Sequence, residues 1–350
     1  MSALKQVLKR VVERGATLSR EEARGVLTEV LASSPGEGDL EIAALLAAMA
    51  TRGETVNELT GFVEVLRALS IPIPLTNVER AGLVDTCGTG GDGMDTFNIS
   101  TAAALVAVAA GAKVAKHGNR AVTSKCGSAD VLEALGVPVT LSPEQAAECL
   151  RVTGFVFMLA PMLHPTMKRV QPIRRALGFR TIFNLAGPLT NPAGAPAQVM
   201  GVYSREKLPL VAETMATLGT RHAFVVHGGD GLDELTLSDE SSVAEIKADR
   251  VRLFRLKPEE AGLDRAPVAA LAGGETAKEN AAILERIFAG EPGPKREIVL
   301  LNAAAALMAA GLAEDFQEGV ALAAAAIDSG AVRKKLAEIS AFGLSVQKLR

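Results

Sequence analysis

The sequence predicts an α/β protein with two parts: a small, all-helical N-terminal domain, and a larger domain in which helices flank a central, largely parallel sheet. Apolar residues keep a helical spacing over about the first 70 residues. Beyond them, short apolar runs alternate with longer helical stretches, which is typical of a parallel sheet. The segment IPIP at 71–74 separates the two patterns, because two prolines cannot continue a helix. We therefore expect domains at 1–74 and 75–350.

The helical part shows its helices through apolar stripes and start signals. The stripes are Leu4, Val7, Leu8, Val11 and Val12, and then Ile42, Leu45, Leu46 and Met49. Ser19 with Glu22, and Thr55 with Glu58, are spaced as capping boxes that begin helices. A further helix, at about 165–180, is a candidate to join this domain.

In the larger part, strands and helices are expected in alternation. The predicted strands are LVDTC (83–87), KVAKHG (113–118), FVFML (155–159), AQVMGVY (197–203) and HAFVVHG (222–228). The predicted helices lie at 100–110, at 164–178 and near 205–218, and an Ala-rich helical tail begins at about 276. The stretch 243–256 is expected to add a hairpin or a strand.

Composition excludes some classes of function. The chain has 350 residues with no Trp, one Tyr and a net charge of −3, so few side chains could stack on bases and no basic excess could hold nucleic acid. No apolar run approaches the roughly 18 residues of a membrane span, and the start of the chain lacks the pattern of a signal peptide. Three widely spaced cysteines suggest thiols in a reducing compartment, and we expect a cytoplasmic protein.

A glycine-rich loop with acidic residues follows the first predicted strand. Gly88, Gly90, Gly91 and Gly93 leave backbone N–H groups free to approach an anion, and NIST (98–101) then begins a helix. Ligands gather at the carboxyl ends of parallel strands, so we interpret this loop as a phosphate site. A plain glycine-rich turn with a helix cap is the alternative, since the order matches no standard phosphate motif. Gly91→Val should block phosphate while disturbing folding little.

Two further loops after strands carry charged groups. Lys116, His117, Asn119, Arg120 and Lys125 lie within ten residues, and Ser128 begins a helix. This stretch is either a solvated basic loop or, with the glycine-rich loop, a clamp for a ligand that has phosphates at both ends.

The loop at 228–235 supplies Asp230, Asp233 and Glu234. Such carboxylates are often only surface charge, but Mg²⁺ held by them and by phosphate oxygens would explain acidic groups near a polyanion. Arg174 and Arg175 offer forks for a carboxylate, although for Arg175 we favour an exposed helix face.

Together these motifs resemble those of the anthranilate phosphoribosyltransferases, a family similar in fold to the class II nucleoside phosphorylases. The resemblance covers essentially the whole chain and rests on GTGGD (88–92), NIST (98–101), KHGNRAVTSKCGSADVLEALG (116–136), RTIFNLAGPLTNP (180–192) and GLDE (231–234). Thr123 and Ala186 depart from the residues usual in the family. The resemblance implies transfer of phosphoribose from 5-phosphoribosyl-1-pyrophosphate (PRPP) to the amine of anthranilate, with release of pyrophosphate, as the second step of tryptophan synthesis from chorismate.

The resemblance also implies roles for individual residues, and none of them is a general acid or base. The donor would be held by Gly88, Gly91, Asp92, Thr96, Asn98, Ile99, Ser100, Thr101, Lys116, His117, Gly118, Asn119, Arg120, Ala121, Val122, Thr123, Ser124 and Ser128. Two Mg²⁺ ions would be bound through Ser100, Asp233 and Glu234. Anthranilate would meet Gly88, His117, Asn119, Arg174 and, on its entry path, His164. A homodimer formed through the helical part is also implied.

Two other functions stay open at the level of sequence. A pyrimidine nucleoside phosphorylase would share the fold and a similar phosphate loop, but the pair Asp233–Glu234 favours a metal-bound pyrophosphate. A non-catalytic relative that binds nucleic acid is disfavoured by the acidic balance of the chain.

Overall fold

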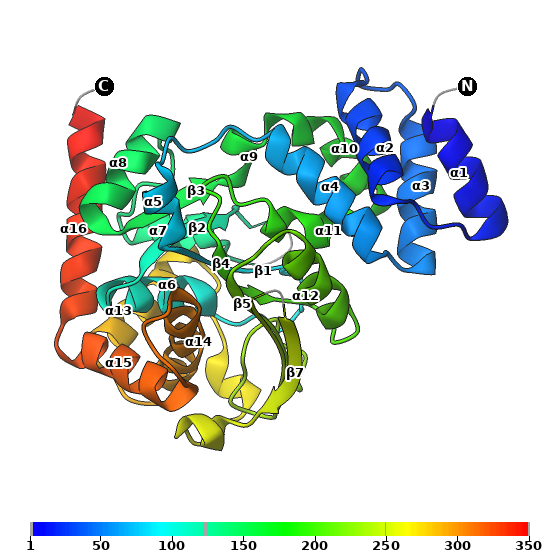
Figure 1. Ribbon diagram of the computed structural model, residues 1–350. Helices are drawn as coiled ribbons and strands as arrows, with labels where there is room; N and C mark the ends of the chain where they lie inside the picture. Colours follow the sequence, from blue (N-terminus) through cyan, green and yellow to red (C-terminus); the bar gives the residue numbers. More distant parts are fainter. Residues whose placement is uncertain (1–2, 122–124, 249, 349–350) are drawn as a thin grey trace.

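The computed structural model describes residues 3–121, 125–248 and 250–348 and has a helical part beside a larger α/β part (Figure 1). The N-terminal helices are α1 (Ala3–Arg14), α2 (Arg20–Ala32), α3 (Asp39–Arg52) and α4 (Val56–Ala68). Both predicted capping boxes are present, at the starts of α2 and α4. Most residues of the apolar stripes are buried against one another, which confirms the predicted bundle. Val12 is the exception: it was expected in the first stripe, but it is exposed to solvent.

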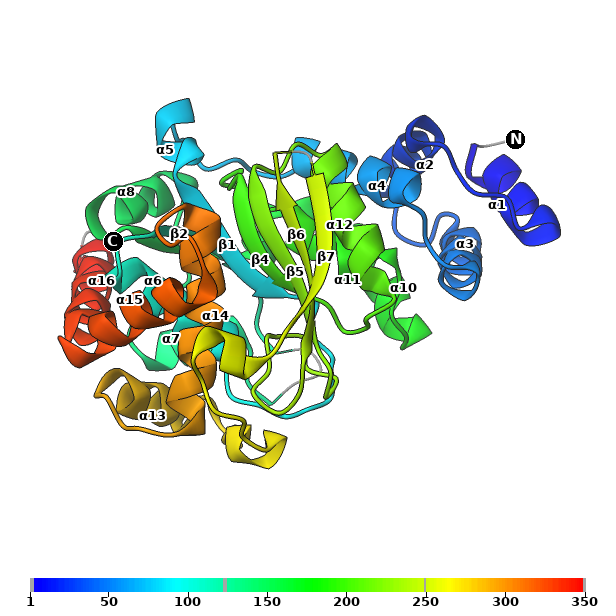
Figure 2. The same cartoon turned by 60° about the horizontal axis from the view of Figure 1, so that its bottom comes forward.

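A seven-stranded sheet with the order β3-β2-β1-β4-β5-β6-β7 forms the centre of the α/β part (Figure 2). Its strands are β1 (Leu83–Gly88), β2 (Lys113–Gly118), β3 (Phe155–Leu159), β4 (Ala197–Gly201), β5 (His222–Gly228), β6 (Ser241–Lys247) and β7 (Arg250–Leu256). The first five are parallel, while β6 and β7 extend the sheet as an antiparallel hairpin. All five predicted strands and the predicted hairpin are confirmed.

Helices cover both faces of the sheet. One face packs on a core that includes α6 (Ile99–Ala109) and α14 (Pro294–Ala310), and the other on α8 (Pro143–Thr153) and α12 (Lys207–Thr217). Strand residues alternate between the faces: Val84 and Val199 join the first core, and Cys87 and Met200 join the second. Outside the connection between β3 and β4, the other elements are α5 (Asn77–Ala81), α7 (Ser128–Ala134), η3 (Pro258–Ala261), η4 (Val268–Leu271), α13 (Ala277–Phe288), α15 (Phe316–Asp328) and α16 (Ala331–Lys348).

The connection between β3 and β4 corrects one prediction. The stretch 164–178 was expected to be a single helix, but it divides into η1 and α10. Pro165 and Pro172 each stand in the first turn of one of them, where a missing N–H costs nothing, and Pro172 cannot continue the turn before it. The elements of this connection are α9 (Ala160–Leu163), η1 (Pro165–Arg169), α10 (Gln171–Leu177), α11 (Ile182–Ala186) and η2 (Gly187–Leu189).

This connection packs against the N-terminal bundle. α10 contacts α3, and η1 contacts α2. Arg169 pairs with Asp39 at 2.8 Å and donates a hydrogen bond to the backbone oxygen of Ser33 at 3.1 Å. Within the described part of the chain, no helix has the length and apolar character that crossing a bilayer requires.

Candidate active site

The glycine-rich loop (residues 88–97) connects β1 to α6 at the carboxyl edge of the sheet. Gly90, Gly91 and Gly93 have φ angles of +67°, +76° and +76°, and the non-glycine Asp95 has +47°. These values lie in the left-handed region that glycine adopts without strain. The loop is fixed by Thr89, whose N–H donates to Gly201 O at 2.9 Å, and by Gly90, whose N–H donates to Asp233 Oδ2 at 2.8 Å.

Close packing explains why glycine stands at the ends of β1 and β4, where both strands contact Asp233. A Cβ at Gly88 would lie 2.5 Å from Asp233 Oδ2, and a Cβ at Gly201 would lie 1.5 Å from Asp233 O. No side chain fits at either position without moving this segment. The ends of β1 and β4 therefore press directly against Asp233.

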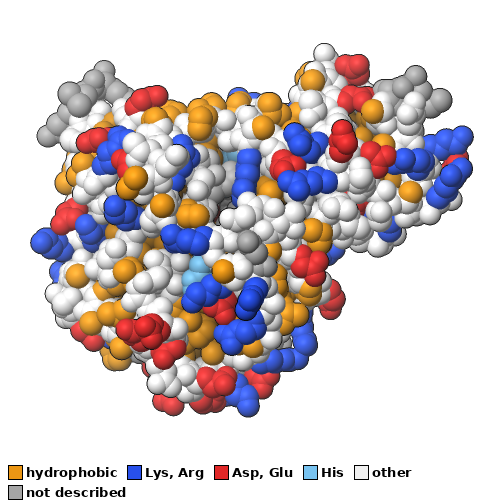
Figure 3. Space-filling view, in the orientation of Figure 1, with side chains coloured by type: hydrophobic (Ala, Val, Ile, Leu, Met, Phe, Trp, Pro, Cys, Tyr) orange, Lys and Arg blue, Asp and Glu red, His pale blue; other side chains and the backbone are white. Residues whose placement is uncertain are grey.

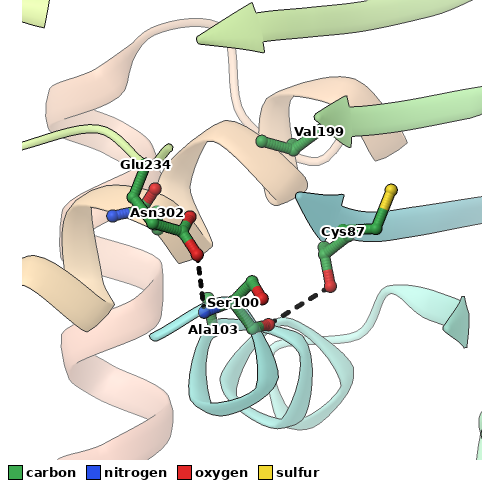
Figure 4. A pocket seen from close by; sticks show the side chains of 7 residues that line it. Cys87, Ser100, Ala103, Val199, Glu234 and Asn302 are labelled. Atoms are coloured by element: carbon green, nitrogen blue, oxygen red, sulfur yellow. Dashed lines mark hydrogen bonds between the residues drawn. The ribbon is translucent and has the colours of Figure 1, made fainter. Parts of the chain in front are cut away.

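The N-terminus of α6 points at the same place. The N–H of Ser100 donates to Glu234 Oε1 at 3.2 Å, and the Thr86 hydroxyl donates to Ser100 O at 3.2 Å (Figure 4). Beside them lies a small cavity of about 10 Å³, lined by Ser100, Glu234 and Asn302 among others. A helix N-terminus carries free N–H groups and partial positive charge, so it attracts anions, here the Glu234 carboxylate.

A buried lysine adds positive charge to this edge. The side chain of Lys116 is 2% exposed, and its Nζ donates to Thr86 O and lies 3.3 Å from Ser100 Oγ. Burial lowers the pKa of Lys116, while the carboxylates of Asp85 and Glu234 oppose that shift. The lysine thus lies between β1 and the start of α6, where an anion bound at this edge would meet it.

Three carboxylates converge opposite this lysine. The Asp233 N–H lies 3.4 Å from Asp92 Oδ2, and both side chains are partly exposed. Desolvation by the surrounding protein, and then repulsion from Asp92, raise the pKa of Asp233 to about 7. Desolvation and the neighbouring Asp233 raise the pKa of Glu234 well above its usual value. Such crowding of acidic groups is relieved when a cation binds between them.

The donor set fits Mg²⁺, a hard cation that prefers oxygen ligands. Among the described residues, no group of three or more His, Cys, Asp or Glu side chains is arranged to hold a metal ion by itself. Mg²⁺ in proteins is commonly held by one or two carboxylates together with phosphate oxygens of the substrate. Asp233, Glu234 and the Ser100 hydroxyl suit that arrangement.

Asp230, the third carboxylate of the loop, does not belong to this cluster. It accepts hydrogen bonds from the hydroxyls of Thr236 and Ser238 and, at 3.2 Å, from the N–H of Leu232. Its carboxylate therefore stabilises the turn after β5.

The second predicted loop follows β2. A Cβ at Gly118 would lie 2.5 Å from Ser128 Oγ, so the strand end and the start of α7 are in close contact. Asn119 and Arg120 are exposed, and Arg120 pairs with Asp130 at 3.0 Å and with Glu133 at 2.8 Å. Val122, Thr123 and Ser124 lie outside the described residues.

Two neighbouring histidines and, apart from them, one arginine are the remaining candidates. The rings of His117 and His164 are 5.1 Å apart, both are buried, and neither Nε2 has a hydrogen-bond partner among the described residues. Burial lowers the pKa of His117 to about 3 and that of His164 to about 4, so both rings are neutral near pH 7. Half-buried Arg174 lies 5.4 Å from the ring centre of Phe183 and has no carboxylate partner within the described ranges.

Some of the predicted site residues are hydrogen-bonded to one another, and others are not. Hydrogen bonds connect Asp92, Ser100, Lys116, Asp233 and Glu234 with one another and with the glycine-rich loop. No hydrogen bond or ion pair links Arg174 to these residues in the described part of the chain, and Arg175 is exposed as expected. Lys and Arg side chains lie where the helical part meets the α/β part on the face shown in Figure 3.

Sequence reasoning missed several residues that hold the site together. Arg180 donates to Gly91 O, and its guanidinium lies 4.3 Å from the ring centre of Tyr203. Arg180 stands at the start of the RTIFN motif, so a signal for it existed. Thr86, which accepts from Lys116, and Asn302 stand in apolar segments that carry no such signal.

The fold and these contacts define a class of protein: an α/β enzyme that binds a phosphorylated substrate at the carboxyl edge of its sheet, with carboxylates suited to a divalent cation. Two family profiles match the chain. One is described as a glycosyl transferase family a/b domain and covers residues 80–333, and the other is that family's helical bundle domain and covers residues 5–70. With the relatives described next, these matches show that the chain belongs to the anthranilate phosphoribosyltransferase family.

The relatives match along nearly their full length. Anthranilate phosphoribosyltransferase of Desulforamulus reducens is 50% identical over 325 residues, which is 93% of this chain and 92% of the relative. The Thermus thermophilus enzyme has a crystal structure with a TM-score of 0.89 and 44% identity, covering 98% of this chain and 99% of that one. The Saccharomyces cerevisiae enzyme in complex with PRPP and Mg has a TM-score of 0.86 and 27% identity, with 98% of both chains covered.

Proposed function

We propose that the protein transfers the phosphoribosyl group of PRPP to the amine of anthranilate, giving N-(5-phosphoribosyl)anthranilate and pyrophosphate. It is a glycosyltransferase of tryptophan biosynthesis. The observation that carries this function is the convergence of Gly90, the N-terminus of α6 and two carboxylates beside Lys116. A yeast relative with the same fold is known in complex with PRPP and Mg, and the same enzyme also with 4-fluoroanthranilate.

The pyrophosphate end of the donor belongs, in this proposal, at the glycine-rich loop and at the start of α6. Ser100, Asp233 and Glu234 would hold two Mg²⁺ ions per site, and the bound metal would supply positive charge to neutralise the leaving pyrophosphate. Backbone N–H groups and Lys116 act on the same charge, because donors aimed at developing charge stabilise the transition state. The other donor contacts that we propose are Gly88, Gly91, Asp92, Thr96, Asn98, Ile99, Thr101, His117, Gly118, Asn119, Arg120, Ala121 and Ser128, together with Val122, Thr123 and Ser124 outside the described residues.

Anthranilate is assigned to the group around the histidines. Arg174 binds its carboxylate, since its guanidinium has no acidic partner among the residues that the structure describes and can form a charge-assisted bond. Gly88, His117, Asn119 and His164 complete the acceptor contacts. No general base is assigned, because an aniline nitrogen has a free lone pair and needs mainly to be held near C1 of the ribose.

Further proposals concern the whole chain. Residues 1–74, joined by the packed segment around α10, act as the helical domain, and 75–350 as the donor-binding domain. The protein forms a homodimer through the helical domain. It works in the cytoplasm, which its three buried, unpaired cysteines support.

The decisive assay follows the loss of anthranilate fluorescence in the presence and absence of PRPP and Mg²⁺. We expect anthranilate fluorescence to fall only when the protein, PRPP and Mg²⁺ are all present. One pyrophosphate should be released for each anthranilate consumed. Phosphorolysis of thymidine or uridine in the absence of Mg²⁺ would instead identify a nucleoside phosphorylase. A DNA mobility shift without turnover would identify a nucleic-acid-binding relative.

The metal assignment has its own test. Asp233→Ala with Glu234→Ala should cut Mg²⁺-dependent turnover strongly and leave anthranilate binding intact, because the carboxylates face the donor rather than the acceptor. Asp239→Ala is the matched control: its carboxylate belongs to the same connection but is exposed and pairs with Arg265. Normal Mg²⁺-dependent activity in the double variant would show that these residues do not bind the metal.

A further inference from the structure

A buried asparagine in α14 lies directly behind the carboxylate pair. Asn302 is 2% exposed and stands in the middle of an otherwise apolar, Ala-rich helical stretch. Asparagine is a poorer helix former than alanine, and an amide is costly to bury unless it is hydrogen-bonded. Its presence there therefore requires partners that use the amide fully.

Two of the three hydrogen bonds of the Asn302 amide go to the backbone of Leu235. Asn302 Oδ1 accepts from the N–H of Leu235 at 3.0 Å, and Nδ2 donates to Leu235 O at 3.0 Å and to Ile298 O at 2.9 Å. Both amide hydrogens and the amide oxygen are thus occupied. The amide holds Leu235 as a neighbouring strand would, with one donor and one acceptor.

Leu235 immediately follows the two carboxylates. Asp233 accepts from Gly90 of the glycine-rich loop, and Glu234 accepts from the N–H of Ser100 at the start of α6. Asn302 and Glu234 line the same small cavity (Figure 4). The segment 233–235 is therefore held by the glycine-rich loop, by the start of α6 and by Asn302. Among the described residues, Asn302 alone makes such a hydrogen bond from the interior of a buried helix.

We propose that Asn302 is a positioning residue for the reaction: it clamps the backbone of Leu235 so that Asp233 and Glu234 are held ready for the metal-bound pyrophosphate. This inference rests on the proposed function of the site. Residues that orient metal ligands typically change metal affinity by about 10- to 100-fold when they are lost. Asn302→Leu should accordingly weaken binding of PRPP with Mg²⁺ by about tenfold or more, and should leave the Michaelis constant for anthranilate within about twofold.

The chain offers a matched control in Asn280 of α13, which is also 2% exposed. Its amide holds the backbone of Gly274 in the same way: Oδ1 accepts from Gly274 N–H at 3.1 Å, and Nδ2 donates to Gly274 O at 3.0 Å and to Thr276 O at 2.9 Å. Gly274 itself makes no hydrogen bond to a carboxylate of the site in the described part of the chain. Asn280→Leu thus removes an equivalent set of bonds away from Asp233 and Glu234.

The experiment measures PRPP binding by titration calorimetry with and without Mg²⁺, both Michaelis constants, and the thermal midpoint of each variant. Both Leu variants should melt at similarly reduced temperatures, but only Asn302→Leu should lose Mg²⁺-dependent donor affinity. Equal donor affinity in the two variants, or a proportional rise of both Michaelis constants in Asn302→Leu, overturns the proposal.

A second variant and a comparison with the parent separate a folding defect, and a wrong function, from a wrong role for Asn302. If Asn302→Leu does not fold, Asn302→Ser replaces it, because a serine hydroxyl can still bond the carbonyl four residues earlier while releasing Leu235. The same donor-affinity criteria then apply to it. Failure of the parent to consume anthranilate, with Mg²⁺-dependent PRPP binding intact, would refute the proposed function and leave the role of Asn302 at the carboxylates open to the calorimetric test.

Discussion

Among single residues, Arg174 is the most direct test of acceptor recognition. A guanidinium–carboxylate bond contributes roughly 1.5–3 kcal/mol, so Arg174→Ala should raise the Michaelis constant for anthranilate by about one to two decades. Donor affinity should change little. Arg175→Ala is the control, because Arg175 is the next residue along α10 and is exposed. A similar loss for both substrates would indicate a structural role for Arg174.

His117 makes a prediction about pH and stability. Its pKa falls from 6.5 to about 3 on folding, mainly through burial, so between these values the unfolded chain binds the extra proton. The neutral ring therefore favours the folded state fully above pH 6.5, and this advantage is lost as the pH falls towards 3. For His117→Asn, we expect the free energy of unfolding to drop by about 2 kcal/mol less than in the parent between pH 7 and pH 5. Urea titrations at both pH values measure this, and equal drops would contradict it.

The sequence predicts a site residue only where a local pattern marks that residue as functional. Gly91, Ser100 and Asp233 stand in polar or glycine-rich loops after strands, where general rules place ligands. Asn302 lies about 70 residues further along the sequence from Glu234, in an Ala-rich helix, and only the packing of α14 under the sheet brings it to that loop. Pairings of this kind depend on tertiary structure, and one sequence without that structure does not contain them.

At the scale of elements, the glycine-rich loop corrects one expectation. Gly91→Val was expected to leave folding nearly unchanged, but φ at Gly91 is +76°, where an L-residue costs about 1–2 kcal/mol. We now expect a lower melting temperature and, in addition, loss of the stabilisation that PRPP with Mg²⁺ gives the parent. Gly262→Val is the control, with φ at +75° and no atom within 4 Å of an added Cβ. It should melt lower too but keep the full ligand-induced shift, whereas a full shift in Gly91→Val would show that the loop does not hold pyrophosphate.

Elements with strong periodic patterns were predicted well, and the exception has a clear cause. The five parallel strands and α6 follow from apolar runs of the expected length. The stretch 164–178 has a helical composition throughout, yet Pro172 divides it, because proline tolerates the first turn of a helix and not its interior. The composition indicated helix, and the positions of the prolines determined where each turn began.

For the whole molecule, the helical part is tied to the α/β part by partly buried charged contacts. Glu54, whose side chain is 3% exposed, pairs with Lys207 of α12 at 2.5 Å, and Arg67 of α4 donates to Leu189 O at 2.8 Å. α4 also packs against α11 and α12. These contacts lie on the inner side of the bundle, so α1 and α3 remain at the outer end of the molecule (Figure 2).

Exposed apolar residues of α1 and α3, at this outer end, allow the proposed homodimer to be tested. Leu40 of α3 is 84% exposed and Val12 of α1 is 61% exposed, and the two helices pack together. Burying such side chains against a second copy favours association, and placing a charge there opposes it. Val12→Glu with Leu40→Glu should therefore turn a dimer into a monomer in sedimentation velocity, with the melting temperature of the chain little lowered, since neither side chain belongs to the core. Val78→Glu, at an 85% exposed position on α5, should leave the dimer intact. A monomeric parent would refute the proposed homodimer, and a dimer that survives the double change would show that these two positions lie outside the interface.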